Sequence, residues 1–112
     1  MRETQLKTKA VALLKKELGC WVYHPSDKFV SGIPDIFVLY KGVFAAIELK
    51  VQKNPASKLQ VITLAKIQRN GGLTWICRDE GNGEGMTQIR TIIATIKARG
   101  DINERTRVTD SL

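Results

Sequence analysis

The apolar residues of the chain recur with two different periods. In three segments they return every three or four residues, which is the spacing of an amphipathic helix. These segments are residues 4–18, residues 57–70 and a stretch that begins at Met86. Gly19 follows the first segment and Gly71-Gly72 follows the second, and glycine in this place typically ends a helix. We therefore predict three helices.

Four shorter runs are rich in β-branched and aromatic residues and are typical of strands. They cover residues 20–24, 36–40, 43–51 and 73–78. Lys41-Gly42, between the second and third runs, is a two-residue connection of the kind that closes a hairpin. The predicted order is helix, strand, strand, strand, helix, strand, helix. This order indicates an α/β fold, with a mixed sheet that carries helices on both faces.

The length of the chain and its polar C-terminal residues suggest how it is organised. A chain of 112 residues can form one small domain around a single core. We assign residues 1–99 to this domain. Residues 100–112 are polar and do not continue the apolar stripe that begins at Met86, so we expect them to form a flexible tail.

Three ionisable residues interrupt the apolar hairpin that residues 36–51 predict. Asp35 precedes the first strand, and Glu48 and Lys50 lie near the end of the second. Glu48 and Lys50 are two residues apart, so their side chains share one face of the strand. A turn at residues 41–42 places Asp35 at about the level of Glu48. The two carboxylates and the ammonium group should therefore converge at the open end of the hairpin.

These residue types point to metal-assisted hydrolysis of a phosphate ester. Mg²⁺ is commonly held by one or two carboxylates together with waters and phosphate oxygens. A bound ion can acidify a water and stabilise charge on a phosphoryl group, and Lys50 could position or deprotonate that water. A solvated surface hairpin is the alternative. However, charges on a strand as apolar as residues 43–51 need a partner or a function.

The same residues resemble the motif of the PD-(D/E)xK nuclease superfamily and, in a fuller form, its VRR-NUC (virus-type replication-repair nuclease) branch. The matching segments are Ser31-Gly32-Ile33-Pro34-Asp35, Ile47-Glu48-Leu49-Lys50 and Ser57-Lys58-Leu59-Gln60. The resemblance covers roughly residues 3 to 79. It implies a restriction-endonuclease-like core with the element order αβββαβα, which agrees with the order predicted from the apolar pattern.

The resemblance also implies roles for individual residues. Asp35 and Glu48 would ligate Mg²⁺ or Mn²⁺, with the backbone carbonyl of Leu49 as a further ligand. Relatives carry a glutamate at the start of the first helix, so Glu3 is a candidate third carboxylate. A glutamate near a helix N-terminus is also favourable without a metal, because it complements the helix dipole. Relatives place a glutamine facing the active site, and Gln60 occupies the corresponding position.

Gln60 has a second explanation that needs no active site. Ser57 and Gln60 have the spacing of a capping box, in which the glutamine side chain accepts a hydrogen bond from the backbone of the capping residue. The two roles are compatible with each other. The sequence therefore leaves open whether Gln60 caps the helix, faces the active site, or does both.

The charge of the chain favours a polyanionic partner. Lysine and arginine outnumber acidic residues by 18 to 11, for a net charge of +7, and nucleic acid is the first candidate for such a domain. The expected DNA contacts are Lys28, Ser31, Lys53, Lys58, Lys66 and Arg69. No apolar run approaches the roughly 20 residues of a membrane span. Two cysteines without metal-site spacing suit a reducing cytoplasm, which the resemblance places in a bacterial or phage-infected cell.

Together these features predict a metal-dependent endodeoxyribonuclease. Stand-alone members of the family resemble Holliday junction resolvases, which act on four-way junctions. We also expect a homodimer, because two symmetric cuts need two active sites. The apolar residues available for an interface, some of which must cover the sheet, are Met86, Ile89, Ile92, Ile93, Ile96, Val61 and Leu64. The alternatives are a non-catalytic DNA-binding subunit with the same fold, or a nickase or ribonuclease of a restriction or defence system.

Overall fold

The computed structural model describes residues 1–25 and 31–111. Within them the chain forms α1 (Glu3–Leu18), β1 (Trp21–Tyr23), β2 (Ile36–Tyr40), β3 (Val43–Val51), α2 (Lys58–Arg69), β4 (Leu73–Asp79) and α3 (Glu84–Ser111). The predicted order αβββαβα is confirmed, and apart from the end of α3 the observed bounds lie close to the predicted ones. Among the described helices, none combines the length and apolarity that crossing a membrane would require.

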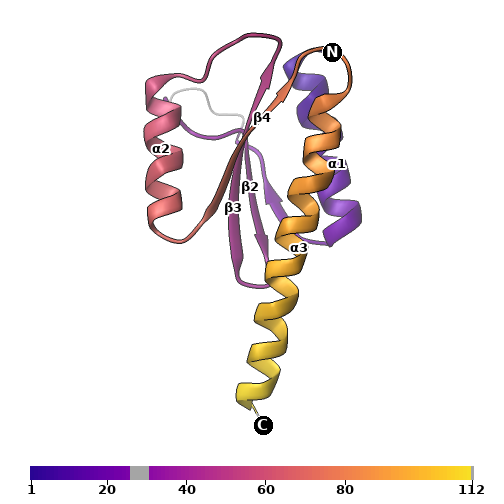
Figure 1. Ribbon diagram of the computed structural model, residues 1–112, viewed down its shortest axis with the longest axis vertical. Coiled ribbons are helices and arrows are strands. Elements are labelled where there is room, and N and C mark those ends of the chain that lie inside the picture. The colour runs from indigo at the N-terminus through magenta and orange to yellow at the C-terminus, as the bar shows by residue number, and fades with distance from the viewer. Residues whose placement is uncertain (26–30, 112) are drawn as a thin grey trace.

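The four strands form one mixed sheet in the order β1-β2-β3-β4. β1 and β2 are antiparallel, as are β2 and β3, whereas β3 and β4 are parallel. A parallel pair needs a crossover connection, and α2 provides it. α2 lies on one face of the sheet, while α1 and α3 pack together on the other (Figure 1). The predicted mixed sheet between two helical layers is therefore confirmed.

The hairpin of β2 and β3 closes at the predicted turn. Lys41 has a φ of 46° and Gly42 has a φ of 82°, and a type I′ turn requires positive values at both of these positions. The turn sets the register of the two strands. Extending that register by one pair beyond β2 places Asp35 level with Glu48, as the sequence predicts.

β3 separates two chemically different faces of the sheet. Its odd-numbered side chains from Val43 to Leu49 are apolar and belong to the core formed with α1 and α3. The fully buried or nearly fully buried residues that these two helices contribute include Leu6, Leu14, Ile89, Ile92 and Ile96. The even-numbered positions of β3 point to the face that carries α2, and they include Glu48 and Lys50. One face of the strand thus holds the hydrophobic core, and the other carries the ionisable residues.

The C-terminal helix is longer than the sequence predicts. α3 continues through residue 100 to Ser111, so the prediction of a flexible tail is wrong for residues 100–111, which are helical. Gly100 is buried in this helix. A Cβ added there would lie 2.4 Å from a carbon of the Tyr40 ring. The helix therefore crosses the hairpin at a separation that only glycine permits.

Polar contacts to the hairpin hold the extended part of α3. The Tyr40 hydroxyl donates a hydrogen bond to Asp101 Oδ1 at 2.9 Å, and Lys41 Nζ lies 3.1 Å from the same oxygen. Lys41 also pairs with Glu104. These hydrogen bonds raise the pKa of Lys41, with Glu104 as the largest cause and Asp101 next. The sequence pattern cannot reveal this extension, because the partners lie on β2 and its turn rather than along the helix.

Gly100→Ala tests the crossing of α3 over the hairpin. In an ordinary helix interior this exchange stabilises a protein by roughly 0.5–1 kcal/mol. Here the added methyl group meets the Tyr40 ring, so we expect a lower melting temperature and a loss of about 1–3 kcal/mol, as in overpacked cores. In a Tyr40→Ala background the obstacle is gone, and the same exchange should stabilise. A higher melting temperature in both backgrounds would contradict the crossing.

Candidate active site

The structure brings together the three ionisable residues that the sequence singles out. Asp35 lies directly before β2, and Glu48 and Lys50 lie on β3. Asp35 Oδ2 accepts a hydrogen bond from the backbone N–H of Leu49 at 2.8 Å. Lys50 Nζ lies 3.2 Å from Glu48 Oε2. The carboxylates of Asp35 and Glu48 are close enough for Asp35 to raise the pKa of Glu48. The predicted convergence at the open end of the hairpin is thus present.

The segment before Asp35 packs tightly on α2 and thereby positions Asp35. Gly32 has a φ of 84°, and a Cβ there would lie 2.8 Å from Leu59 Cβ and 2.9 Å from the Leu59 carbonyl carbon. Only glycine allows this approach at this backbone angle. Pro34 is buried and precedes Asp35. Asp35 lies one residue before Ile36, which forms the last residue pair between β2 and β3. From this position its carboxylate accepts the hydrogen bond from the Leu49 N–H.

Glu48 is the most deeply buried charged group of the site, with 1% of its surface exposed. Its Oε2 atom accepts a hydrogen bond from Gln60 Nε2 and pairs with Lys50. Its Oε1 atom is buried and has no hydrogen-bond partner among the described residues. Burial raises the pKa of Glu48 to about 7, the nearby Asp35 adds to the rise, and Lys50 opposes it. A buried oxygen without a partner beside a second carboxylate has the chemistry of a cation ligand.

Gln60 makes contacts that fit both of the roles that the sequence leaves open. The Oε1 atom of Gln60 accepts a hydrogen bond from the backbone N–H of Ser57 at 2.8 Å. The backbone N–H of Gln60 donates in turn to Ser57 Oγ at 3.1 Å. These two bonds form the predicted capping box at the start of α2. Its Nε2 atom at the same time donates to Glu48 Oε2. The amide group connects the helix cap to the buried carboxylate, because it offers an acceptor on one side and a donor on the other.

Glu3 is the first residue of α1 and is half-buried. Over the described ranges 1–25 and 31–111, no group of three or more acidic, histidine or cysteine side chains could hold a metal ion. The structure therefore does not bring Glu3 into one such group with Asp35 and Glu48. Its position in the first turn of α1 suits the helix dipole. The ligand role of Glu3 stays a prediction.

Five of the six residues expected to contact DNA lie within the described part of the chain, and all five are exposed. Ser31 is exposed and lies just before the segment that leads into β2. The remaining exposed members of the set are Lys53, Lys58, Lys66 and Arg69, from the loop after β3 and from α2. The described part of α2 contains no acidic residue. Lys28 lies outside the described residues.

Arg78 is a site residue that the sequence reasoning did not identify. It lies on β4, in register with Lys50. Its Nη1 atom donates to the backbone carbonyls of Gln52 at 2.8 Å and Asn54 at 2.7 Å. Arg78 thereby holds the loop that leads from β3 to α2. A charged residue near the end of an apolar strand is the signal that marks Glu48 and Lys50, and it could have marked Arg78 as well.

Comparison with known proteins supports the fold. No family model matches the chain, and no curated protein matches it. A solved structure of a VRR_NUC domain is similar with a TM-score of 0.65 and 20% identity, over 82% of this chain and 94% of that one. The Holliday junction resolvase Hjc of Archaeoglobus fulgidus is similar with a TM-score of 0.56 and 21% identity, over 70% of this chain and 69% of that one. The chain therefore has the α/β nuclease fold of these two structures, as the motif around Asp35, Glu48 and Lys50 predicts.

Proposed function

We propose that the chain is a metal-dependent endodeoxyribonuclease that hydrolyses phosphodiester bonds in branched DNA such as four-way junctions. The observation that carries the proposal is the buried carboxylate of Glu48, which lies beside Asp35 and Lys50 and has one oxygen without a partner in the part of the chain that the structure describes. The arrangement is found on a fold shared with a VRR_NUC domain and a junction resolvase. A non-catalytic DNA-binding subunit would have no use for such a costly cluster.

The donor set fits a hard divalent cation. Asp35 and Glu48 would hold Mg²⁺ or Mn²⁺ with the carbonyl of Leu49, and Mg²⁺ commonly uses one or two carboxylates in this way. Such an ion, when bound, would acidify a water and stabilise negative charge on the phosphate. Glu3 is the candidate for a further carboxylate ligand. Burial and the neighbouring Asp35 raise the pKa of Glu48, and binding of a cation would favour its charged form.

Lys50 and Gln60 would prepare the site for the reaction. The Lys50 ammonium group is almost completely buried and lies 3.2 Å from Glu48. From there it can orient the attacking water, hold a proton, or neutralise the charge that develops on the phosphate. Gln60 holds the Glu48 carboxylate in place from the start of α2. Its second hydrogen bond, to Ser57, keeps the amide group from rotating.

DNA would approach on the face of the sheet that carries α2. Lys53, Lys58, Lys66 and Arg69 are exposed there, and cations of this kind contact phosphates and position the duplex. Lys28 and Ser31 would add contacts beside the segment that leads to Asp35. The net charge of +7 further favours association with a polyanion.

A homodimer remains part of the proposal, but most of the residues that the sequence offers for its interface are buried within the chain. The isoleucines of α3 at positions 89, 92, 93 and 96 are buried in the core of the chain itself. Leu64 is also buried, whereas Val61 is half exposed. Leu59 and Ile62 on α2 are exposed to a similar extent. A second copy would therefore pack against exposed residues of this kind, so that two sites could make paired cuts.

Substitution of either carboxylate tests the metal site. Asp35→Asn and Glu48→Gln keep the shape of the side chain and remove a charged ligand, so cleavage of a four-way junction with Mg²⁺ should be lost. Mg²⁺ should raise the melting temperature of the original chain but not of the variants, because a bound ion stabilises only a protein that holds it. Junction binding measured with a chelator should persist. Normal turnover in either variant would refute the assignment.

Lys50→Ala tests the role of the ammonium group. We expect cleavage to slow by a factor on the order of 10²–10⁴, which is the usual contribution of a general acid or base. Stabilisation by Mg²⁺ should remain, because both carboxylates are intact. Lys53→Ala is the matched control, since it removes an exposed lysine of the following loop and should weaken only DNA binding. A Lys50→Ala protein with normal cleavage would show that Lys50 takes no part in the reaction.

Gln60→Glu and Ser57→Ala separate the two functions of Gln60. Glutamate can still accept the Ser57 N–H bond, but it cannot donate to Glu48 and it adds a negative charge beside it. Cleavage by Gln60→Glu should therefore change while α2 keeps its cap. Ser57→Ala should lower stability by about 0.5–2 kcal/mol and leave cleavage largely intact. Unchanged kinetics and melting in Gln60→Glu would show that Gln60 is only a cap.

A further inference from the structure

Four aromatic side chains form a continuous strip across the sheet. Trp21 and Tyr23 lie on β1, Phe37 on β2 and Phe44 on β3. Successive ring centroids are 6.0, 6.4 and 5.7 Å apart, and the rings are within 24° of parallel. Tyr23 is paired with Phe37 in the register of β1 and β2, so the strip crosses from one strand to the next. We call these residues the aromatic strip.

The aromatic strip lies on the same face of the sheet as the candidate active site. Asp35 and Phe37 are two residues apart, and so Asp35 continues the line of Phe37 along β2. Phe44 and Glu48 are four residues apart on β3, a separation of about 13 Å at the usual strand rise. The strip therefore passes near Asp35 at Phe37, whereas its Phe44 end lies farther from Glu48 on the same face.

The strip is exposed although it is aromatic. Trp21 is 56% exposed, Tyr23 50% and Phe44 39%. On this face α2 packs on β3 and β4, at the end of the sheet opposite β1. Apolar surface that remains in water contributes little to folding, and a connected patch of it generally marks a binding surface.

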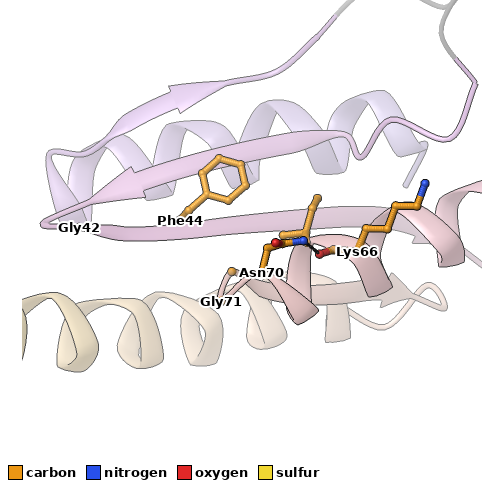
Figure 2. A pocket seen from close by; sticks show the side chains of 7 residues that line it. Gly42, Phe44, Lys66, Asn70 and Gly71 are labelled. Carbon is orange, nitrogen blue, oxygen red and sulfur yellow. Dashed lines mark hydrogen bonds between the residues drawn. The ribbon is translucent and has the colours of Figure 1, made fainter.

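A basic cavity adjoins the strip at Phe44. It has a volume of about 500 Å³ and lies between the hairpin and the end of α2. Figure 2 shows Phe44 on β3, Lys66 on α2 and Asn70 directly after α2 around it. The Asn70 amide donates a hydrogen bond to the Lys66 carbonyl at 2.8 Å, which fixes it at the cavity wall. Among the described residues that line the cavity, Lys66 is the only charged one.

We propose that the aromatic strip binds unpaired nucleotides of a DNA strand, and that the cavity at Phe44 receives a base and its phosphate. Exposed rings, with a lysine on the wall of the adjoining cavity, are features that recognise single-stranded nucleic acid, because every base has a flat aromatic face and every nucleotide a negative charge. A cavity of this size suits a small polar ligand. The link to cleavage rests on the proposed nuclease function, because the strip would then hold the strand that leaves the site at a branch.

Binding of a fluorescent 12-residue oligothymidylate, measured by anisotropy with a chelator present, tests the proposal. Trp21→Leu and Phe44→Leu keep apolar volume and remove the ring. Each should weaken binding about fivefold to a hundredfold, since stacking contributes roughly 1–3 kcal/mol per base. Binding of a blunt duplex of the same length should change less than twofold. Trp21→Phe restores a flat ring and should retain most of the affinity.

Leu39→Ala is the matched control, because Leu39 is 47% exposed and lies beside the strip without a ring. It should bind the oligothymidylate normally. Melting temperatures confirm that each variant is folded. Unchanged binding by both leucine variants would overturn the proposal, as would an equal loss in Leu39→Ala. Light scattering measures self-association of the same variants. If the leucine variants lose self-association but bind the oligothymidylate normally, the strip binds a second copy of the chain and the proposal is overturned.

The same proteins assayed with Mg²⁺ on a four-way junction distinguish this inference from the proposed function. If the original chain binds the oligothymidylate through the rings but never cleaves, the nuclease proposal fails and the strip remains a nucleotide-binding surface. If the original chain cleaves while the leucine variants bind and cleave as it does, the nuclease proposal holds and the strip has no such role.

Discussion

The carboxylate of Glu48 is buried in an interior strand of the sheet, and much of the structure around it serves to keep it there. Transfer of a carboxylate from water into a protein interior is costly unless the group is paired and hydrogen-bonded. Gln60 and Lys50 satisfy one of its oxygens, and the other has no partner among the described residues. Burial and the neighbouring Asp35 raise the pKa of Glu48, and the contact with Lys50 opposes that rise. One buried carboxylate oxygen is thus available to a group that the described residues do not supply.

The rest of the scaffold holds the partners of that carboxylate at the right distance. Gly32 allows the segment before β2 to approach the first turn of α2, which places Asp35 on one side of the site and Gln60 on the other. Arg78 holds the loop that joins β3 to α2. These contacts connect β2, β3, β4 and α2 at one end of the sheet. A small change in the angle of α2 would therefore move Gln60 away from Glu48.

The two faces of the sheet are used for different purposes. On one face, α1 and α3 cover β3 with aliphatic side chains and supply the free energy of folding. On the other face, α2 packs on β3 and β4, and aromatic and charged side chains are exposed beside it. A small domain can keep a costly polar site only if its core is complete without that site. Here the core is completed on the opposite face.

Local patterns in the sequence determined most of the fold. The helical and strand periods, the Lys41-Gly42 turn and the Ser57 capping signal concern residues that are neighbours in the chain, so their structures follow from propensity and spacing. The convergence of Asp35, Glu48 and Lys50 also followed, because a two-residue turn sets the hairpin register and register sets which side chains meet.

Contacts between distant segments were decided only by the tertiary structure. The length of α3 depends on Tyr40 and Lys41, which pack against a helix sixty residues later in the chain. The hydrogen bond from Gln60 to Glu48 depends on how α2 packs on β3. The aromatic strip draws its members from three strands. No pattern within any one segment encodes these contacts, because each partner lies on a different element and they meet only after the elements have packed.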